Sequence, residues 1–216
     1  ATWPHALAQP MPMRLEISQA VVSTPMEPVK WLFYGDSLTA GFHAFGRLFA
    51  PYAAALGEEL KLSEPHELWV CGLSGLEATE LMKKKTSPQI RDAVRRTGPG
   101  IERLLSEKTF DLAFIMLGTN DLASGEDEET FNAIKKIHEA CHAVKLRTVA
   151  LLVPPSQAVA KFRDIADSRE KVNDLLQQWA KVTPMTHSVD TGELLPFSKD
   201  SEFWEIDGLH FSRLGS

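Results

Sequence analysis

The apolar residues of this chain fall into five short runs, separated by longer stretches of mixed character. Two of these runs, in the segments "LAFIML" and "VALLV", are continuously apolar and do not alternate with polar residues. Continuous runs of this length are typical of strands that are buried on both faces of a sheet. The predicted strands are Trp31–Tyr34, Glu67–Cys71, Asp111–Leu117, Thr148–Val153 and Met185–Val189.

The stretches between these strands carry the amphipathic spacing of helices. Strands and helices therefore alternate, which predicts a parallel sheet covered by helices. We expect an α/β protein: a three-layer α/β/α sandwich with a central, mainly parallel five-stranded sheet. Residues 29–216 are expected to form a single domain after an irregular, Pro-rich N-terminal extension over residues 1–28. The predicted helices are Arg47–Leu60, Glu77–Lys85, Gln89–Arg96, Ile101–Glu107, Glu128–Lys145 and Asp167–Lys181.

Glycines and polar residues gather where predicted strands end. "GDSL" follows the first strand, "CGLSGLEAT" the second and "LGTNDL" the third, and "DGLHFS" lies near the C-terminus. Ligands bind at the carboxyl edge of open α/β sheets, so these distant segments are expected to meet there. Gly-Asp-Ser alone decides nothing, because these residues are also ordinary turn formers.

The same segments contain the groups that a serine hydrolase needs. A serine hydroxyl such as that of Ser37 requires a base, usually an imidazole, and a carboxylate commonly orients that imidazole. Asp207 and His210 are three residues apart, a spacing that allows contact in a turn or at the start of a helix. Candidate donors to an oxyanion are the Ser37 N–H, the Gly75 N–H and the Asn120 side-chain amide.

These four blocks in this order resemble those of a GDSL-type member of the SGNH hydrolase superfamily, which is named for its Ser, Gly, Asn and His. "GDSL" would carry the nucleophile, "GLSG" the glycine, "GTND" the asparagine, and "DGLH" the acid and base. The resemblance covers about residues 30–212. It implies the flavodoxin-like fold of that family and no metal or organic cofactor.

By this resemblance, Ser37 would attack an ester or thioester carbonyl, His210 would be the general base and Asp207 would orient it. The oxyanion hole would comprise Ser37, Gly75 and Asn120, with Asp36 and Asp121 as supporting residues. Asp36 is expected to accept backbone hydrogen bonds that hold its loop.

Two features depart from the family pattern. Many members begin the glycine block with Asn-x-Gly-x-Ser-Gly, where this chain has Val70 at the asparagine position. Members also usually carry a closing helix after the histidine block, whereas this sequence stops at Ser216. We therefore expect one flank of the sheet to be left for a partner or another copy of the chain, so a homo-oligomer is possible.

Other residues allow rival interpretations. Ser74 nearly fits a Gly-x-Ser-x-Gly elbow, but Leu76 occupies the last glycine position. His138 and His142 have a metal-binding spacing without a third ligand, so a surface histidine pair is expected. Asp190 follows the last strand, where a spare triad acid is one interpretation, but a turn-forming aspartate before Thr191 and Gly192 is expected. Phe42, Phe203 and Trp204 are candidates for a substrate pocket, with a place in the core as the alternative for each.

Composition limits the classes of partner. A formal net charge of -6 argues against nucleic acid as the main partner, since phosphate binding requires a basic face. No apolar run approaches the roughly 18 residues that span a bilayer, so no integral membrane segment is expected. Two cysteines do not form a disulfide framework, which mildly favours a soluble, intracellular protein.

The leading hypothesis is a serine esterase that acts on small-molecule esters, with lipase, thioesterase, lysophospholipase or carbohydrate deacetylase activity as variants. One alternative shares the acyl-enzyme but passes the acyl group to an alcohol. Another alternative is a catalytically silent binding module with the same fold.

Overall fold

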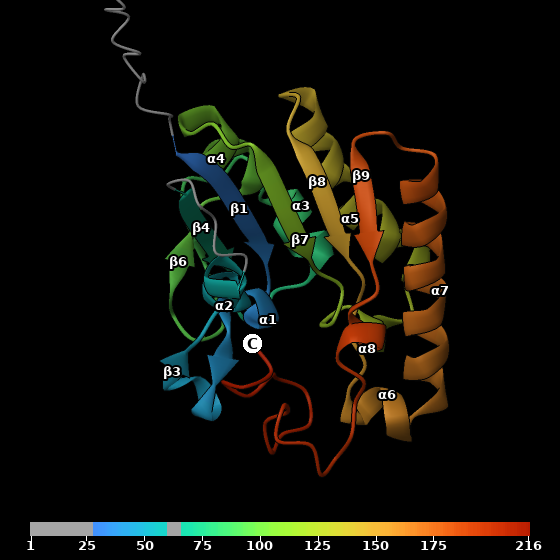
Figure 1. Cartoon of the computed structure of the whole chain (residues 1–216). Helices are drawn as coiled ribbons and strands as arrows, with labels where there is room; N and C mark the ends of the chain where they lie inside the picture. Colours follow the sequence, from blue (N-terminus) through green and yellow to red (C-terminus); the bar gives the residue numbers. More distant parts are fainter. Residues whose placement is uncertain (1–27, 60–65) are drawn as a thin grey trace, which may run out of the picture.

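A five-stranded sheet, parallel throughout, forms the centre of the protein in a computed structural model that describes residues 28–59 and 66–216 (Figure 1). The Pro-rich extension was predicted over residues 1–28, and residues 1–27 of it lie outside the described part of the chain. The sheet has the order β4-β1-β7-β8-β9, which confirms the predicted α/β class. Its strands are β1 (Val29–Gly35), β4 (His66–Gly72), β7 (Leu112–Met116), β8 (Arg147–Leu151) and β9 (Thr186–Val189).

The strand order reverses between β1 and β7. From β1 the chain moves outward to β4, then returns to the other side of β1 for β7 and continues to β9. Such a switch point creates a crevice at the carboxyl ends of its strands. Gly35, at the end of β1, pairs with Gly72 on β4 and Met116 on β7, so three polar segments start from one place.

Helices cover one face of the sheet densely. The buried side chains there form the main core, in which Leu32 and Ile115 of the strands pack with Ile137 of α5 and Leu176 of α7. In Figure 1, α3, α4 and α5 lie behind the sheet and α7 stands beside β9. The helices of the described chain are α1 (Ser37–Ala40), α2 (Tyr52–Glu59), α3 (Ala78–Lys83), α4 (Ile101–Glu107), α5 (Asp127–Ala143), α6 (Gln157–Lys161), α7 (Arg163–Lys181) and α8 (Thr191–Leu194), with 3-10 turns η1 (Ala44–Gly46) and η2 (Leu122–Ser124).

The opposite face of the sheet is covered more thinly. Tyr52 at the start of α2 packs edge-on against Phe33 of β1, and a second, smaller core gathers around Leu38 and Met116. A hollow of about 400 Å³ lies beside it, between α2, α8 and the exposed side of β7, β8 and β9.

Two predicted helices differ from the structure. The segment predicted as a helix over residues 89–96 forms a hairpin of β5 (Ile90–Arg91) and β6 (Thr97–Gly98). The carboxylate of Asp92 accepts the N–H groups of Val94 and Arg96, and this local bonding competes with a helix. The helix predicted from residue 47 starts at Tyr52, because residues 42–49 form the hairpin β2 (Phe42–His43) and β3 (Leu48–Phe49).

No helix within the described residues is long and apolar enough to cross a membrane.

Candidate active site

Ser37 lies at the sharp turn from β1 into the short helix α1. Asp36 caps this helix, its Oδ1 accepting the N–H of Leu38 at 2.9 Å, as expected for a loop-holding aspartate. A Cβ on Gly35 would come within 2.2 Å of the Met116 carbonyl oxygen and Thr39 Oγ1, so only glycine fits before the turn. The turn therefore presents the Ser37 hydroxyl at the carboxyl edge of the sheet.

His210 brings the C-terminal segment against this serine. Its Nε2 lies 2.9 Å from Ser37 Oγ, across 173 positions of sequence, and its Nδ1 lies 2.8 Å from Asp207 Oδ2. The other carboxylate oxygen of Asp207 accepts the backbone N–H groups of Leu209 and His210 at 2.9 and 3.0 Å. The turn that supplies the acid thus also fixes the position of the imidazole.

The environment keeps Asp207 ionised. Burial raises the pKa of this carboxyl, but the hydrogen bonds from His210 and from the Leu209 N–H outweigh that effect and hold the pKa below its usual value. The ring of Phe42 packs against the imidazole, with ring centroids 4.3 Å apart and planes tilted by 31°. His210 is therefore held by a carboxylate at one nitrogen and by an aromatic face.

The glycine and asparagine blocks are tied together beside Ser37. Asn120 Nδ2 donates to the carbonyl of Leu76 at 2.9 Å, which fixes the amide and uses one of its two N–H groups. Asp121 accepts the backbone N–H groups of Ala78 and Thr79, at the start of α3. Burial raises the pKa of Asp121, which these two N–H groups partly offset.

Gly75 adopts a left-handed conformation, with a φ of +75°. The preceding residue, Ser74, is attached to the β5–β6 hairpin: its N–H donates to Asp92 Oδ2, and its carbonyl accepts the N–H of Ala93. Asp92 was not a candidate residue, because residues 89–96 were predicted to form a helix.

Buried polar atoms surround the turn that holds Ser37. Within the described residues, Asp36 Oδ2 is buried with no hydrogen-bond partner, and the hydroxyls of Thr39 and Tyr52 are buried as well. Burial raises the pKa of Asp36 to about 7, an effect that the Leu38 N–H reduces and the nearby Asp121 charge increases. Burial therefore favours the protonated form of the Asp36 carboxyl.

The three candidate pocket residues have different surroundings. Phe42 is half-buried against His210, and Phe203 is 41% exposed. Trp204 is 6% exposed and packs edge-on against Phe197 and Phe211, which places it in the smaller core instead of a pocket wall. Phe203 and Trp204 are neighbours in one aromatic segment, so the sequence alone could not tell that one is exposed and the other lies in the core.

The residues with rival interpretations, Ser74, Asp190 and the pair His138 and His142, do not form a second group like that of Ser37, His210 and Asp207. Ser74 is buried, and no described group bonds its hydroxyl. Asp190 caps α8 by accepting the Gly192 N–H, as expected of a turn former. The expectation of a surface histidine pair is wrong for His138, which is fully buried and bonded to Thr148. Among residues 28–59 and 66–216, no group of three or more His, Cys, Asp or Glu side chains could hold a metal ion.

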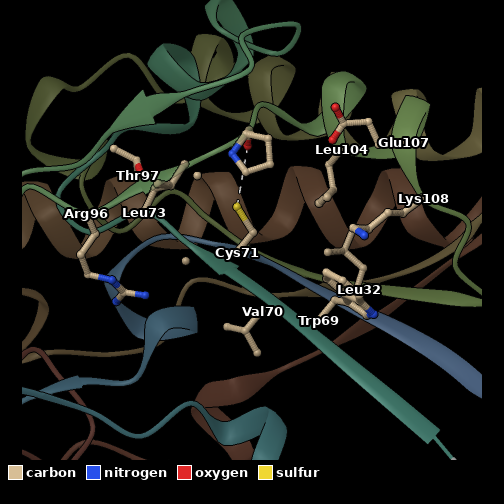
Figure 2. A pocket seen from close by; sticks show the side chains of 13 residues that line it. Leu32, Trp69, Val70, Cys71, Leu73, Arg96, Thr97, Leu104, Glu107 and Lys108 are labelled. Carbon is tan, nitrogen blue, oxygen red and sulfur yellow. Dashed lines mark hydrogen bonds between the residues drawn. The ribbon is translucent and has the colours of Figure 1, made fainter.

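Cys71 lines a separate cavity of about 300 Å³ along the edge strand β4 (Figure 2). Its Sγ donates to the carbonyl of Pro99 at 3.7 Å, and burial raises the pKa of the thiol to about 12. A thiol that stays protonated is a poor nucleophile. Ser37, Asp207 and His210 do not line this cavity.

The sequence was compared with protein families and with curated proteins. Residues 33–216 match the GDSL-like Lipase/Acylhydrolase family. No curated protein matches the sequence significantly.

Solved structures show the same fold at low sequence identity. The structure of TesA is 17% identical, with a TM-score of 0.64, covering 86% of this chain and 91% of that one. A member of the lipolytic protein G-D-S-L family from Veillonella parvula DSM 2008 is 16% identical, with a TM-score of 0.63 and coverages of 87% and 91%. The psychrotrophic esterase EstA from Pseudoalteromonas sp., inhibited by monoethylphosphonate, is 15% identical, with a TM-score of 0.62 and coverages of 86% and 89%.

Proposed function

The chain belongs to the GDSL-like lipase/acylhydrolase family, and from that premise we propose that it is a serine esterase, which cleaves carboxylic esters through an acyl-enzyme on Ser37. The observation that carries this proposal is the position of His210, whose two ring nitrogens lie 2.9 Å from Ser37 Oγ and 2.8 Å from Asp207 Oδ2. Both distances lie within hydrogen-bond reach, which a general base requires.

Acylation would begin when Ser37 Oγ attacks the carbonyl carbon of the ester. His210 Nε2 takes the hydroxyl proton, while the Nδ1–H donates to Asp207 and keeps the ring in the required tautomer. The negative charge on Asp207 stabilises the imidazolium that forms. His210 then gives the proton to the leaving alkoxide, so an alcohol departs and an acyl group remains on Ser37.

Charge on the carbonyl oxygen would be met by three donors: the N–H groups of Ser37 and Gly75 and the free N–H of the Asn120 amide. The bond from Asn120 to Leu76 supports this role, because it fixes the amide before substrate binds. Water, activated by His210, would attack the acyl-enzyme and release the acid.

Hydrolysis is favoured over acyl transfer by the access of solvent to the site. The Asp207 side chain is 30% exposed and that of His210 is 12% exposed. Acyl transfer needs water to be kept from the acyl-enzyme, and an acid that faces solvent does not supply that protection. Thioesters and lipid or carbohydrate esters remain within the proposed reaction class.

The test is a panel of p-nitrophenyl esters of increasing acyl length, assayed on wild type, Ser37→Ala and Ser74→Ala. We expect wild type to release p-nitrophenolate and Ser37→Ala to lose about 10⁴-fold or more of kcat. Ser74→Ala is the matched control, a neighbouring buried serine outside the proposed machinery, and should keep its activity. Full activity in Ser37→Ala would refute the proposed nucleophile.

Two further results would select the alternatives. If glycerol added as an acceptor collected most of the acyl group, the protein would be a transferase. If wild type cleaved no ester, the silent binding module would be the better account.

A further inference from the structure

Two loops beside the proposed nucleophile expose large apolar side chains to solvent. Phe45, at the tip of the β2–β3 hairpin, is 74% exposed, and Leu48, on its strand β3, is 57% exposed. Ile206, which directly precedes Asp207, is 87% exposed. We call Phe45, Leu48 and Ile206 the apolar rim.

The members of the apolar rim are held near one another. The N–H of Ala44 donates to Glu205 Oε2 at 3.1 Å, and Phe45 and Ile206 are the residues that directly follow these two partners. Leu48 pairs with His43 across the hairpin. Figure 1 shows the hairpin, marked by β3, and the red C-terminal loop at the end of the molecule where α1 begins. Phe42 of the same hairpin packs against the His210 ring, and Ile206 directly precedes Asp207, so the apolar rim lies beside the residues that contact Ser37.

The hairpin tip adopts an unfavourable backbone conformation that leaves Phe45 in solvent. Ala44 and Phe45 have φ values of +51° and +57°, in the left-handed region that residues with a side chain rarely adopt. Strain of this kind persists only where the surrounding structure imposes it, and it is concentrated at functional sites. The hairpin backbone thus keeps Phe45 in solvent instead of packed in the core.

Positive charge lies next to the apolar rim, although the whole chain carries a formal net charge of -6. Arg47 is exposed on the same hairpin, and Arg91, Arg95 and Arg96 are exposed on the β5–β6 hairpin. The guanidinium carbon of Arg96 lies 4.0 Å from the centroid of the Phe49 ring, which brings the two hairpins together. Among the nearby carboxylates, Asp92 is buried and bonded to backbone N–H groups, Glu205 accepts the Ala44 N–H, and Asp207 is bonded to His210. Glu202 is exposed on the same C-terminal loop, so the arginines outnumber the exposed, unbonded carboxylates.

We propose that the apolar rim inserts into the surface of a lipid aggregate with anionic head groups, so that Ser37 meets its ester at that surface. Exposed apolar side chains next to basic residues are the combination that binds anionic lipid surfaces. A protein partner on the same surface would lie over the residues around Ser37, whereas a lipid surface can supply the ester. This inference rests on the proposed esterase function for its substrate, but the binding itself does not require catalysis.

The binding test uses the Ser37→Ala protein, so that lipid is not consumed, and vesicles of phosphatidylcholine with one quarter phosphatidylglycerol. We expect this protein to cosediment with the vesicles and to bind vesicles of phosphatidylcholine alone less tightly. Adding F45S and I206S together should weaken binding at least tenfold. Adding V144S and V182S is the matched control, because Val144 and Val182 are 55% and 79% exposed and follow α5 and α7, before β8 and β9 begin.

Single substitutions test the same idea in case the variant with both F45S and I206S does not fold. Ile206→Ser alone should weaken binding, and Ile206→Trp should strengthen it, since tryptophan partitions well into the head-group region. Arg91→Gln with Arg95→Gln should lower binding to anionic vesicles several-fold.

The inference is overturned if Ser37→Ala does not bind anionic vesicles, or if the apolar-rim and control variants bind equally. Soluble esters cleaved without vesicle binding would remove this inference alone, whereas vesicle binding without ester cleavage would remove the esterase proposal alone.

Discussion

At each end of the central sheet, a histidine ring nitrogen lies within hydrogen-bonding distance of a hydroxyl oxygen. At the carboxyl edge, His210 Nε2 lies 2.9 Å from Ser37 Oγ. Near the amino ends of β8 and β9, His138 Nδ1 lies 2.8 Å from Thr148 Oγ1, and His142 Nε2 lies 3.2 Å from the same atom. The two regions share an imidazole–hydroxyl contact and differ in everything around it.

The region at the amino ends is a closed structural network. The hydroxyls of Thr148 and Thr186 lie 3.0 Å apart, and the Trp179 ring packs against both histidine rings. His138 is fully buried and has no carboxylate at its other nitrogen, and Nε2 has no described partner. These side chains tie α5 and α7 to the sheet.

The region at the carboxyl edge is open and has a directional set of partners. Asp207 bonds one nitrogen of His210 and leaves the other for Ser37. An imidazole–hydroxyl contact is therefore not a catalytic site by itself. A carboxylate partner for the imidazole and partial exposure to solvent distinguish the carboxyl edge from the amino ends.

The comparison also predicts opposite responses to pH. Burial raises the pKa of Asp36 to about 7 at the carboxyl edge, so the stability it contributes is present at acid pH and lost as the pH rises through that value. Burial lowers the pKa of His138 to about 3 at the other end, an effect that neighbouring His142 increases. Its contribution is present above the ordinary histidine value of 6.5 and is lost as the pH falls toward 3.

The largest effect is expected from removing the charge that distinguishes the two ends. Asp207→Asn should lower kcat on a soluble p-nitrophenyl ester by about 10³- to 10⁴-fold, because an amide does not stabilise the imidazolium. Asp200→Asn, an exposed position in the same C-terminal segment, is the control and should change kcat less than twofold. A near-normal kcat in Asp207→Asn would contradict the idea that the Asp207 carboxylate makes the contact between His210 and Ser37 catalytic.

The next effect concerns the buried carboxyl at the carboxyl edge. Asp36→Asn keeps an oxygen that can accept the Leu38 N–H but has no proton to lose. The wild-type free energy of unfolding should fall relative to that of the variant between pH 4 and pH 8, by up to about 4 kcal/mol. Urea unfolding of both proteins at the two pH values measures this difference.

Asp190→Asn, the same change at the cap of α8, controls for loss of a capping carboxylate. Identical pH dependence in wild type and Asp36→Asn would show that Asp36 does not titrate in this range.

A third change breaks the network at the amino ends of the strands. Thr148→Val removes the hydroxyl that His138, His142 and Thr186 share and leaves a buried ring nitrogen without its partner. The free energy of unfolding should fall by about 1–3 kcal/mol, while kcat on a soluble ester stays within twofold of wild type. Thermal unfolding and steady-state kinetics on one preparation separate the two effects, and a large loss of kcat would contradict a purely structural role.

The smallest effect is expected from the aromatic face beside His210. Phe42→Leu keeps apolar bulk but removes the ring that stacks on the imidazole, so kcat should fall roughly fivefold with little change in KM. A rise in KM at constant kcat would instead identify Phe42 as a wall of the substrate pocket. Phe203→Leu provides the comparison, because no described ring contact joins Phe203 to His210.

The central sheet and the four blocks were predictable because their signals are local. A strand buried on both faces, such as β7, appears as an apolar run, and each block follows directly from such a strand or lies in a recognisable motif. The identity of the site also depended on the resemblance to a known family, since Asp207 and His210 at a spacing of three are common by chance.

The remaining features depend on contacts that the sequence does not encode locally. The bond from Ala44 to Glu205 spans 161 positions, and the two-residue strands of the hairpins are too short to have a periodicity. Burial of His138 follows from the packing of α5 and α7 on β8 and β9, so its helical spacing suggested a surface pair. Trp204 packs in the core because Phe211 folds back beside it.

The most direct test of the central claim, that His210 and Asp207 activate Ser37 alone among the serines, is covalent labelling. Wild type, Ser37→Ala and Thr148→Val would be treated with a p-nitrophenyl alkylphosphonate and examined by intact and peptide mass spectrometry. We predict a single phosphonyl adduct on Ser37 in wild type and in Thr148→Val, and none in Ser37→Ala. An adduct on another residue, or an unlabelled Ser37 in an active enzyme, would contradict the account.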